Sequence, residues 1–167
     1  PVAICQPVIL ALDANGSAFL NATDMDAGSF DTESGIASYS VDINTFSCSD
    51  EGQLIPVTLT VTDNAGNSSS CTDFILIQDQ QMPTASCRNI TVALNANGEA
   101  TITPADIDNG STDNCPSGLS LSLSNDRFDC SMIGTQTVTL TVTDGSLNSS
   151  VCSANVTVVD NTPPQIT

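Results

Sequence analysis

Two acidic segments carry the residue types best suited to holding a metal ion. Both have the spacing Asp-x-Asp-x-Gly-x-x-Asp. Clustered carboxylate oxygens are ligands that calcium prefers, and the spacing resembles the first half of a calcium loop without its distal glutamate. The alternative is that these residues only build turns, through side-chain to backbone hydrogen bonds. The candidate ligands are Asp24, Asp26 and Asp31 in the first segment and Asp106, Asp108 and Asp113 in the second.

The residues between the aspartates predict how the carboxylates are presented. In an extended segment Asp24 and Asp26 share the outer face, while Met25 points inward as an apolar anchor. Ile107 takes the place of Met25 in the second segment. We therefore expect paired carboxylates in solvent with an apolar side chain behind them.

Two further candidate ligands, Asp160 and Asn161, precede Thr-Pro-Pro near the end of the chain. This stretch is similar to the calcium-binding linkers of cadherins. The corresponding stretch from Asp79 to Pro83 lacks the asparagine, which argues against a metal there. Bound Ca²⁺ is the one cofactor that the sequence suggests.

Paired carboxylates also serve glycosidases, but the rest of the composition argues against an enzyme. The chain has no tryptophan and one tyrosine, Tyr39, to stack on a sugar. It has no histidine, which weakens every mechanism that depends on that base. The same acids recur in both halves, which fits a shared structural role better than a single active site. We expect no catalytic residues.

The charge balance excludes whole classes of partner. The chain has nineteen acidic residues, two arginines (Arg88 and Arg127) and no lysine, so its formal net charge is -17. Binding to nucleic acid needs cations that neutralise phosphates, and anionic membranes make the same demand. No apolar run is long enough to insert directly into a bilayer. We expect neither nucleic acid nor membrane as a partner.

An internal repeat organises the whole chain. The word VTLTVTD occurs at residues 57–63 and again at 138–144, and cysteines, glycines and aspartates recur at an offset of 81 or 82 positions. We interpret residues 1–82 and 83–163 as two tandem domains. Residues 164–167 are expected to be the start of a following repeat or a tail.

The sequence pattern of each repeat predicts a set of short strands. In VTLTVTD the apolar residues alternate with threonine, as in a half-buried antiparallel strand. Similar alternation marks 90–94, 99–103, 119–123 and 152–158, with turns between these segments and no helical period. The predicted fold is all-β, with two tandem immunoglobulin-like β-sandwich domains.

Seven cysteines with no C-x-x-C spacing indicate a disulfide framework, and hence an extracellular or cell-surface location. The four cysteines of the second repeat allow three connectivities. Because the first and last strands of such a sandwich can lie side by side in parallel, we expect their cysteines to pair. The predicted bonds are Cys5–Cys71, Cys87–Cys152 and Cys115–Cys130, with Cys48 as a buried free thiol or an intermolecular partner.

The motifs carry a resemblance to a known family. Pro-x-x-x-Cys at the start, Asp-x-x-Gly-Asn-Ser-Ser-x-Cys at residues 63–71 and Val-Val-Asp-Asn-Thr-Pro-Pro at the end resemble hyalin-repeat (HYR-like) immunoglobulin-like modules. The likeness is greatest to those in giant surface adhesins and appendages of Bacteroidota. It implies a non-catalytic structural repeat, a spacer, stalk or packing element of an adhesin or surface filament, whose partners are neighbouring repeats or subunits. The alternative is a lectin-like module that binds glycans through calcium.

The two repeats differ at positions predicted to face outward. Ile9, Phe19, Phe74 and Leu76 of the first repeat align with Thr91, Thr101, Asn155 and Thr157 of the second. Contiguous apolar patches of several hundred Å² are uncommon on isolated soluble domains. We therefore expect these four residues to form a contact surface for a neighbouring domain or subunit. The alternative is that the first repeat twists differently and buries them.

Overall fold

The chain forms two compact units, Pro1–Gln81 and Met82–Thr167. The computed structural model describes residues 1–115 and 118–163, so the expected start of a following repeat at 164–167 lies outside the described residues. Unit 1 contains β1 (Val8–Ala11), β2 (Ser17–Phe19), β3 (Ile36–Val41), β4 (Thr45–Ser47), β5 (Leu54–Asp63) and β6 (Ser68–Gln78). Unit 2 contains β7 (Ile90–Ala93), β8 (Glu99–Thr101), β9 (Ser120–Leu123), β10 (Arg127–Asp129), β11 (Gly134–Thr143) and β12 (Ser149–Val159).

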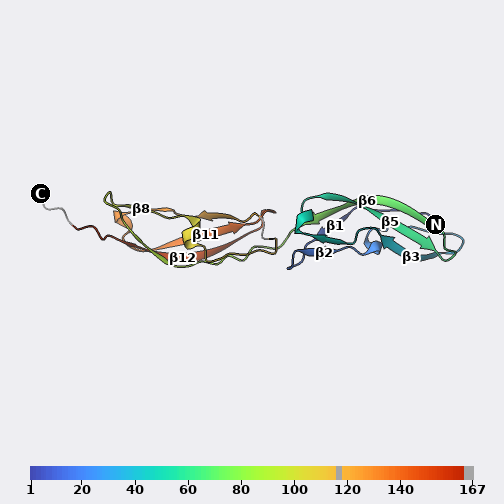
Figure 1. Cartoon of the computed structure of the whole chain (residues 1–167), viewed down its shortest axis with the longest axis horizontal. Helices are drawn as coiled ribbons and strands as arrows, with labels where there is room; N and C mark the ends of the chain where they lie inside the picture. Colours follow the sequence, from blue (N-terminus) through green and yellow to red (C-terminus); the bar gives the residue numbers. More distant parts are fainter. Residues whose placement is uncertain (116–117, 164–167) are drawn as a thin grey trace. The chain divides into compact units, whose positions relative to one another are not determined.

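Both units have the same strand topology (Figure 1). In unit 1 a four-stranded sheet has the order β1-β6-β5-β3, and β2 pairs with β4 in a second sheet. In unit 2 the corresponding orders are β7-β12-β11-β9 and β10-β8. The first strand of each unit lies parallel to the last, and the remaining pairs are antiparallel. Each unit is therefore an immunoglobulin-like β-sandwich, as predicted.

The repeated VTLTVTD word forms the central strand of each core. Its apolar side chains are fully buried on β5 and β11, while the threonines between them stay partly exposed. The second sheet contributes a phenylalanine, Phe46 in unit 1 and Phe128 in unit 2, with 5% and 2% of its surface exposed. Burial of one face of each sheet explains why the sequence alternates with a period of two.

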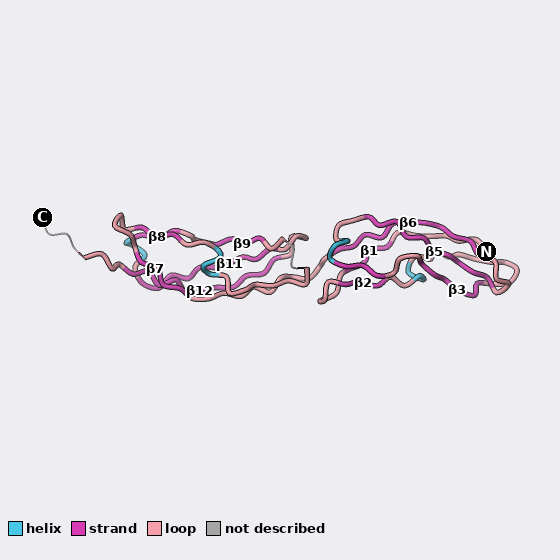
Figure 2. The backbone as a smooth tube through the Cα atoms, viewed as in Figure 1, coloured by secondary structure: helices cyan, strands magenta, loops and turns pink. Residues whose placement is uncertain are grey.

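Short helical turns lie between some of the strands (Figure 2). They are η1 (Ala22–Asp24), η2 (Cys48–Asp50), η3 (Cys130–Met132) and the single turn α1 (Pro104–Ile107). The extended conformation expected for the acidic segments is therefore wrong for residues 22–24 and 104–107. At 104–107 the cause lies in the local sequence, because Thr103 precedes Pro104 and Asp106 follows at the third helical position, which is a helix-starting pattern. At 22–24, Asn21 and Asp24 take the places of Thr103 and Asp106. Among the described residues, no helix is both long enough and apolar enough to cross a membrane.

The turn between the last two strands has the same form in both units although its sequence differs. Gly66 in unit 1 has a φ of 88°, and Leu147 at the equivalent position has a φ of 69°. The backbone N–H of each donates to the carbonyl of the aspartate that begins the turn, Asp63 or Asp144. A leucine held at positive φ stores strain, since its Cβ crowds the backbone.

Replacing Leu147 by glycine is therefore expected to stabilise unit 2 by about 1 kcal/mol. The leucine side chain is 82% exposed, so little packing is lost. Urea denaturation of the Leu147→Gly variant measures the gain. The reverse change, Gly66→Leu, should cost unit 1 a similar amount. A loss of stability in Leu147→Gly would contradict this explanation.

Candidate functional site

The first two aspartates of each acidic segment are hydrogen-bond acceptors within their own loops. Asp24 Oδ2 accepts from the backbone N–H of Asn21 at 3.3 Å, and Asp106 Oδ2 accepts from that of Thr103 at 2.7 Å. The apolar residue between the aspartates is fully buried in both segments, as predicted for Met25 and Ile107. In each segment the buried apolar side chain packs into the core, and the aspartates bind backbone N–H groups of the same segment.

The second aspartate of each segment binds the serine three residues on. Asp26 Oδ1 accepts from the backbone N–H of Ser29 at 2.9 Å. Asp108 Oδ1 accepts from the backbone N–H of Ser111 at 3.0 Å and also from its hydroxyl. The glycine of the motif supports this turn, because Gly28 and Gly110 have φ of 96° and 81°.

The third aspartate differs between the units. Asp31 Oδ1 accepts from the backbone N–H of Ser34 at 2.6 Å and from those of Glu33 and Gly35 at 3.1 Å. Asp113 Oδ2 accepts from the backbone N–H of Cys115 at 3.0 Å. Its Oδ1 is buried with no hydrogen-bond partner among the described residues.

At the end of the chain, Asp160 also accepts locally. Its Oδ1 accepts from the backbone N–H of Thr162 at 2.9 Å and from the hydroxyl of the same residue. Asn161 is exposed. This geometry is that of an Asx turn closed by the threonine.

The predicted calcium ligands do not converge within either segment. In the described chain, no three ligand oxygens from Asp24, Asp26 and Asp31 lie within 4.8 Å of one another, and the same holds for Asp106, Asp108 and Asp113. Calcium takes six to eight oxygens, so each segment would need ligands from elsewhere. The hydrogen bonds favour the alternative that these residues build turns, and calcium stays a prediction.

The same hydrogen bonds lower the pKa of several carboxyls. The pKa of Asp31 is well below its usual range, foremost because the backbone N–H of Ser34 donates to it. The backbone N–H of Thr103 lowers the pKa of Asp106, and the hydroxyl of Ser111 lowers that of Asp108. These groups are acceptors that remain ionised, rather than proton donors.

We therefore expect the chain to lose stability in acid. A carboxyl whose folded pKa lies below its unfolded value stabilises the fold above the unfolded pKa, about 3.9 for aspartate, and this stability is lost as the pH falls through the folded pKa. The free energy of unfolding should be level between about pH 7 and 5 and fall below about pH 4. Urea denaturation across this range measures it. In the variant Asp108→Asn, the free energy of unfolding should fall less steeply below about pH 4. A free energy of unfolding that rises below about pH 4 would contradict the expectation.

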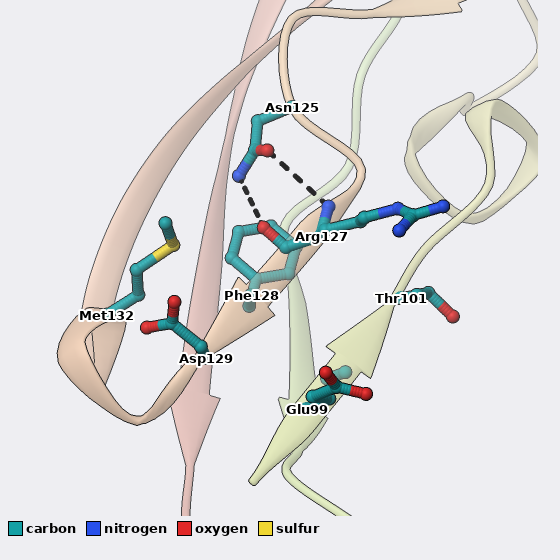
Figure 3. Close-up of a pocket in the computed structure, with 8 residues that line it drawn as sticks. Glu99, Thr101, Asn125, Arg127, Phe128, Asp129 and Met132 are labelled. Atoms are coloured by element: carbon teal, nitrogen blue, oxygen red, sulfur yellow. Dashed lines mark hydrogen bonds between the residues drawn. The ribbon is translucent and has the colours of Figure 1, made fainter.

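A cavity of about 340 Å³ lies beside the paired strands β8 and β10 in unit 2, lined by residues of both strands together with Asn125 and Met132 (Figure 3). Asn125 closes one side, since its Nδ2 donates to the carbonyl of Arg127 at 2.8 Å. The cavity also holds the carboxylates of Glu99 and Asp129. A glycosidase acid needs a raised pKa, but the hydroxyl of Ser131 lowers the pKa of Asp129. Asp129 is therefore not the acid of raised pKa that such a mechanism needs.

No family model matches the sequence, and no curated protein matches it. Among solved structures, the protocadherin GammaB4 extracellular domain is 14% identical, with a TM-score of 0.40, over 92% of this chain and 31% of its own length. Human protocadherin-24 EC1-2 is 10% identical, with a TM-score of 0.48, over 96% of this chain and 99% of its own. Immunoglobulin domains 1–4 of Sidekick-1 are 10% identical, with a TM-score of 0.31, over 95% of this chain and 51% of theirs.

The chain thus spans about a third of the first of these structures. The identities and TM-scores are too low to support an inference about activity, partner or ligand. The fold assignment rests on the strand order and register of each unit.

The disulfides follow the prediction in part. Cys5 is bonded to Cys71 and Cys87 to Cys152, so in both units the segment just before the first strand is joined to the last strand, as expected. The expected free thiol at Cys48 is wrong, because Cys48 is disulfide-bonded.

The predicted bond Cys115–Cys130 is wrong as well, since Cys115 is disulfide-bonded and Cys130 is an exposed free cysteine. Cys115 precedes β9, whose first residue pairs with Thr143 at the end of β11, whereas Cys130 precedes the start of β11. A ten-residue strand spans about 30 Å, and a disulfide needs Cα atoms within about 7 Å. Unit 2 therefore holds these two cysteines toward opposite ends.

Three of the four predicted interface residues lie on one sheet. Ile9 on β1 pairs with Leu76 on β6, and Phe74 is two residues before Leu76, on the same side. Phe19 lies on β2, in the other sheet, so the single patch expected from the sequence is wrong for this residue. Ile9, Phe19 and Phe74 are 63%, 57% and 50% exposed, so unit 1 does not bury them within its own fold.

Two residues that the sequence analysis missed complete this patch. Leu54 on β5 pairs with Leu76 and is 64% exposed, and Pro56 pairs with Phe74. Their counterparts in unit 2 are Thr135 and Thr137, which pair with Thr157 and Asn155. Aligning β5 with β11 residue by residue would have revealed them. We define the apolar face as Ile9, Leu54, Pro56, Phe74 and Leu76.

Two buried carboxylates that the sequence analysis did not single out close the turns between the last two strands of each unit. Asp63 and Asp144 are each 4% exposed, and each accepts from the backbone N–H of the asparagine four residues on at 2.8 Å. The side-chain amide of that asparagine, Asn67 or Asn148, donates to the other carboxylate oxygen at 2.9 Å. The repeated Asp-x-x-x-Asn spacing was the signal for them.

Proposed function

We propose that the chain is a pair of non-catalytic structural repeats, a spacer or stalk within an extracellular adhesin or surface filament. The disulfides support an oxidising, extracellular location. The resemblance of the motifs to HYR-like modules of Bacteroidota surface proteins supports the finer assignment.

The observation that carries the proposal is the parallel pairing of the first and last strands in each unit. Because β1 and β6 run in the same direction, the chain enters unit 1 at one end of the sheet and leaves it at the other. The same holds for β7 and β12 in unit 2. Tension between the ends of a unit therefore shears this strand pair along its length, and a disulfide joins the two segments beside it.

A spacer of this kind presents no ligand site of its own. On a glycan array, the proposal predicts that the chain captures no glycan, either in millimolar calcium or in EDTA. Calcium-dependent capture would overturn the proposal in favour of a lectin-like module. The 167-residue chain with the Cys5–Cys71 and Cys87–Cys152 bonds intact, checked by mass spectrometry, is the material for this test.

The apolar face supports a packing role in addition to a spacer. Three of its side chains are half-exposed or more, so they form an apolar patch on the order of a few hundred Å². Exposed apolar patches of this size on monomeric proteins are often binding sites. The outward residues of β5 and β6 include no charged side chain, although the chain carries a net charge of -17. Two copies can therefore meet through this face without opposing carboxylates, and we propose a second copy as its occupant.

This contact is expected to be weak, because a stable interface buries about 800 Å² per partner. Sedimentation at physiological salt, which screens the net charge, should detect self-association at chain concentrations near 1 mM. Exchanging the face for its unit 2 counterparts, through Ile9→Thr, Leu54→Thr, Phe74→Asn and Leu76→Thr, should abolish the association and leave the chain folded.

The repeat supplies a matched gain-of-function variant. The changes Thr91→Ile, Thr135→Leu, Asn155→Phe and Thr157→Leu place the same side chains on the same backbone positions of unit 2. Association should become at least several-fold tighter, because each chain then has two such faces. A chain that stays monomeric in all three forms would contradict the packing role and leave the spacer role untouched.

A further inference from the structure

The free thiol of Cys130 lies at a position that the repeat uses for a disulfide. Cys130 is the first residue of η3, and Cys48 is the first residue of η2 in unit 1. Each Sγ is 3.7 Å from the carbonyl oxygen of a turn glycine, Gly98 or Gly16. The local geometry is therefore the same, yet Cys48 is disulfide-bonded and Cys130 is exposed and free.

The backbone on both sides fixes where this sulfur points. Phe128, two residues before Cys130, is buried in the core, and Gly134, four residues after it, begins β11. A side chain on Gly98 would place its Cβ 2.6 Å from the Cys130 Sγ, so the glycine leaves room for the sulfur. The thiol thus lies at the surface, next to Gly98.

Cys130 lies at the end of unit 2 where the chain leaves the sandwich. Gly134 pairs with Val158, the penultimate residue of β12, and Val159 is followed by the segment that runs to Pro163. A repeat that follows in the sequence would therefore begin beside this thiol. Unit 2 itself offers no partner, since Cys87, Cys152 and Cys115 are all disulfide-bonded.

Unit 2 carries a cysteine near its own leading end, whereas unit 1 has Glu33 close to this position. Thr112 bridges to Thr84 near the start of unit 2, and Cys115 follows three residues later. We propose that Cys130 forms a disulfide with the Cys115-type cysteine of a following repeat. This deepens the proposed spacer function, on which it rests, because it would close the junction between successive modules covalently.

The bond requires an oxidant, which a disulfide donor such as oxidised glutathione supplies. The Cys130 thiolate attacks one sulfur of the donor, forms a mixed disulfide and releases one glutathione thiolate. The thiolate of the following repeat then attacks the Cys130 sulfur, forms the inter-module bond and releases the second glutathione. The two protein thiols lose two electrons and two protons, which the two glutathione molecules gain.

The test extends the chain by one module. Residues 1–163 are followed directly by a second copy of residues 83–163, folded with oxidised and reduced glutathione, and mapped by mass spectrometry without reduction. We expect a peptide pair that joins Cys130 to the Cys115 equivalent of the added copy, and loss of thiol labelling at Cys130. Cys130→Ser, and Cys115→Ser confined to the added copy, should each remove this pair and leave Cys5–Cys71 and Cys87–Cys152 closed.

A Cys130 that still labels fully, while the added copy closes its own Cys87–Cys152 bond, would overturn the inference. If the added copy fails to close that bond, the inference is tested on the 167-residue protein instead. Treated with oxidised glutathione, it should gain one glutathionyl group, at Cys130, and a Cys130 that does not react would overturn the inference. Neither result bears on the glycan test, so failure here is distinguishable from failure of the spacer proposal.

Discussion

Removing the Cys87–Cys152 disulfide, by the double substitution Cys87→Ala and Cys152→Ala, is expected to lower the free energy of unfolding of unit 2 by about 4 kcal/mol. The bond closes a loop with a sequence separation of 65 residues, which restricts the unfolded chain strongly. A domain of this size has a small core, so the loss is a large part of its total stability. We expect the midpoint of thermal unfolding to fall by roughly 15–30 °C.

Urea denaturation without reductant, followed by hydrogen exchange in peptides from residues 83–163, measures this loss in unit 2. The single substitution Cys130→Ser is the control, because it removes an exposed thiol without opening a bond, and it should change stability by less than about 0.5 kcal/mol. A double variant that loses less than about 1 kcal/mol would mean that packing alone holds the first and last strands together.

Replacing Phe46 by alanine is expected to destabilise unit 1 by about 3–5 kcal/mol. The ring is 5% exposed and lies on the short strand β4, opposite Ala18 of β2, so few other side chains can fill the space it leaves. Phe74 in the same unit is the matched control. Half of its surface is already in water, so Phe74→Ala should cost about 1 kcal/mol.

Urea denaturation of the two variants side by side separates core from surface. The expected difference of several kcal/mol is the evidence that Phe74 is held outward. Equal losses would mean that Phe74 belongs to the core of unit 1, and the apolar face would then no longer be available to a second copy.

The strands were the most predictable part of the structure. Alternation in Val57, Leu59 and Val61 reports burial of one sheet face directly, and the repeat supplies the same evidence twice. The bonds at Cys5 and Cys87 were also predictable, because parallel pairing of the first and last strands brings their cysteines together.

Other features depend on how loops meet in space, which alternation does not encode. The pairing of Cys115 with Cys130 failed because the order of cysteines along the chain does not reveal which end of the sandwich each one reaches. The alternation of residues along a strand predicts that Phe19 and Ile9 both face outward. It does not reveal that their strands belong to different sheets. The α1 turn was predictable from Thr103, Pro104 and Asp106, but a search for longer helical periods overlooks a single turn.

The acidic segments show why residue type alone is weak evidence for a metal site. A carboxylate that accepts backbone N–H groups in its own turn and a carboxylate that binds calcium can occur in the same sequence pattern. The distinction lies in whether oxygens from several loops converge. In Asp26 and Asp108, one carboxylate oxygen accepts from the backbone N–H of the serine three residues on.

The central claim, that each unit is a spacer clamped across its first and last strands, is tested most directly by pulling single molecules from their ends. The Cys5–Cys71 bond has a sequence separation of 66 in a unit of 81 residues, so about 15 residues lie outside the loop. Full extension of unit 1 should then release at most about 50 Å of chain without reductant, whereas the fully extended unit would span roughly 280 Å once the disulfide is reduced. Extension of well over 200 Å per unit in the oxidised protein would contradict the account.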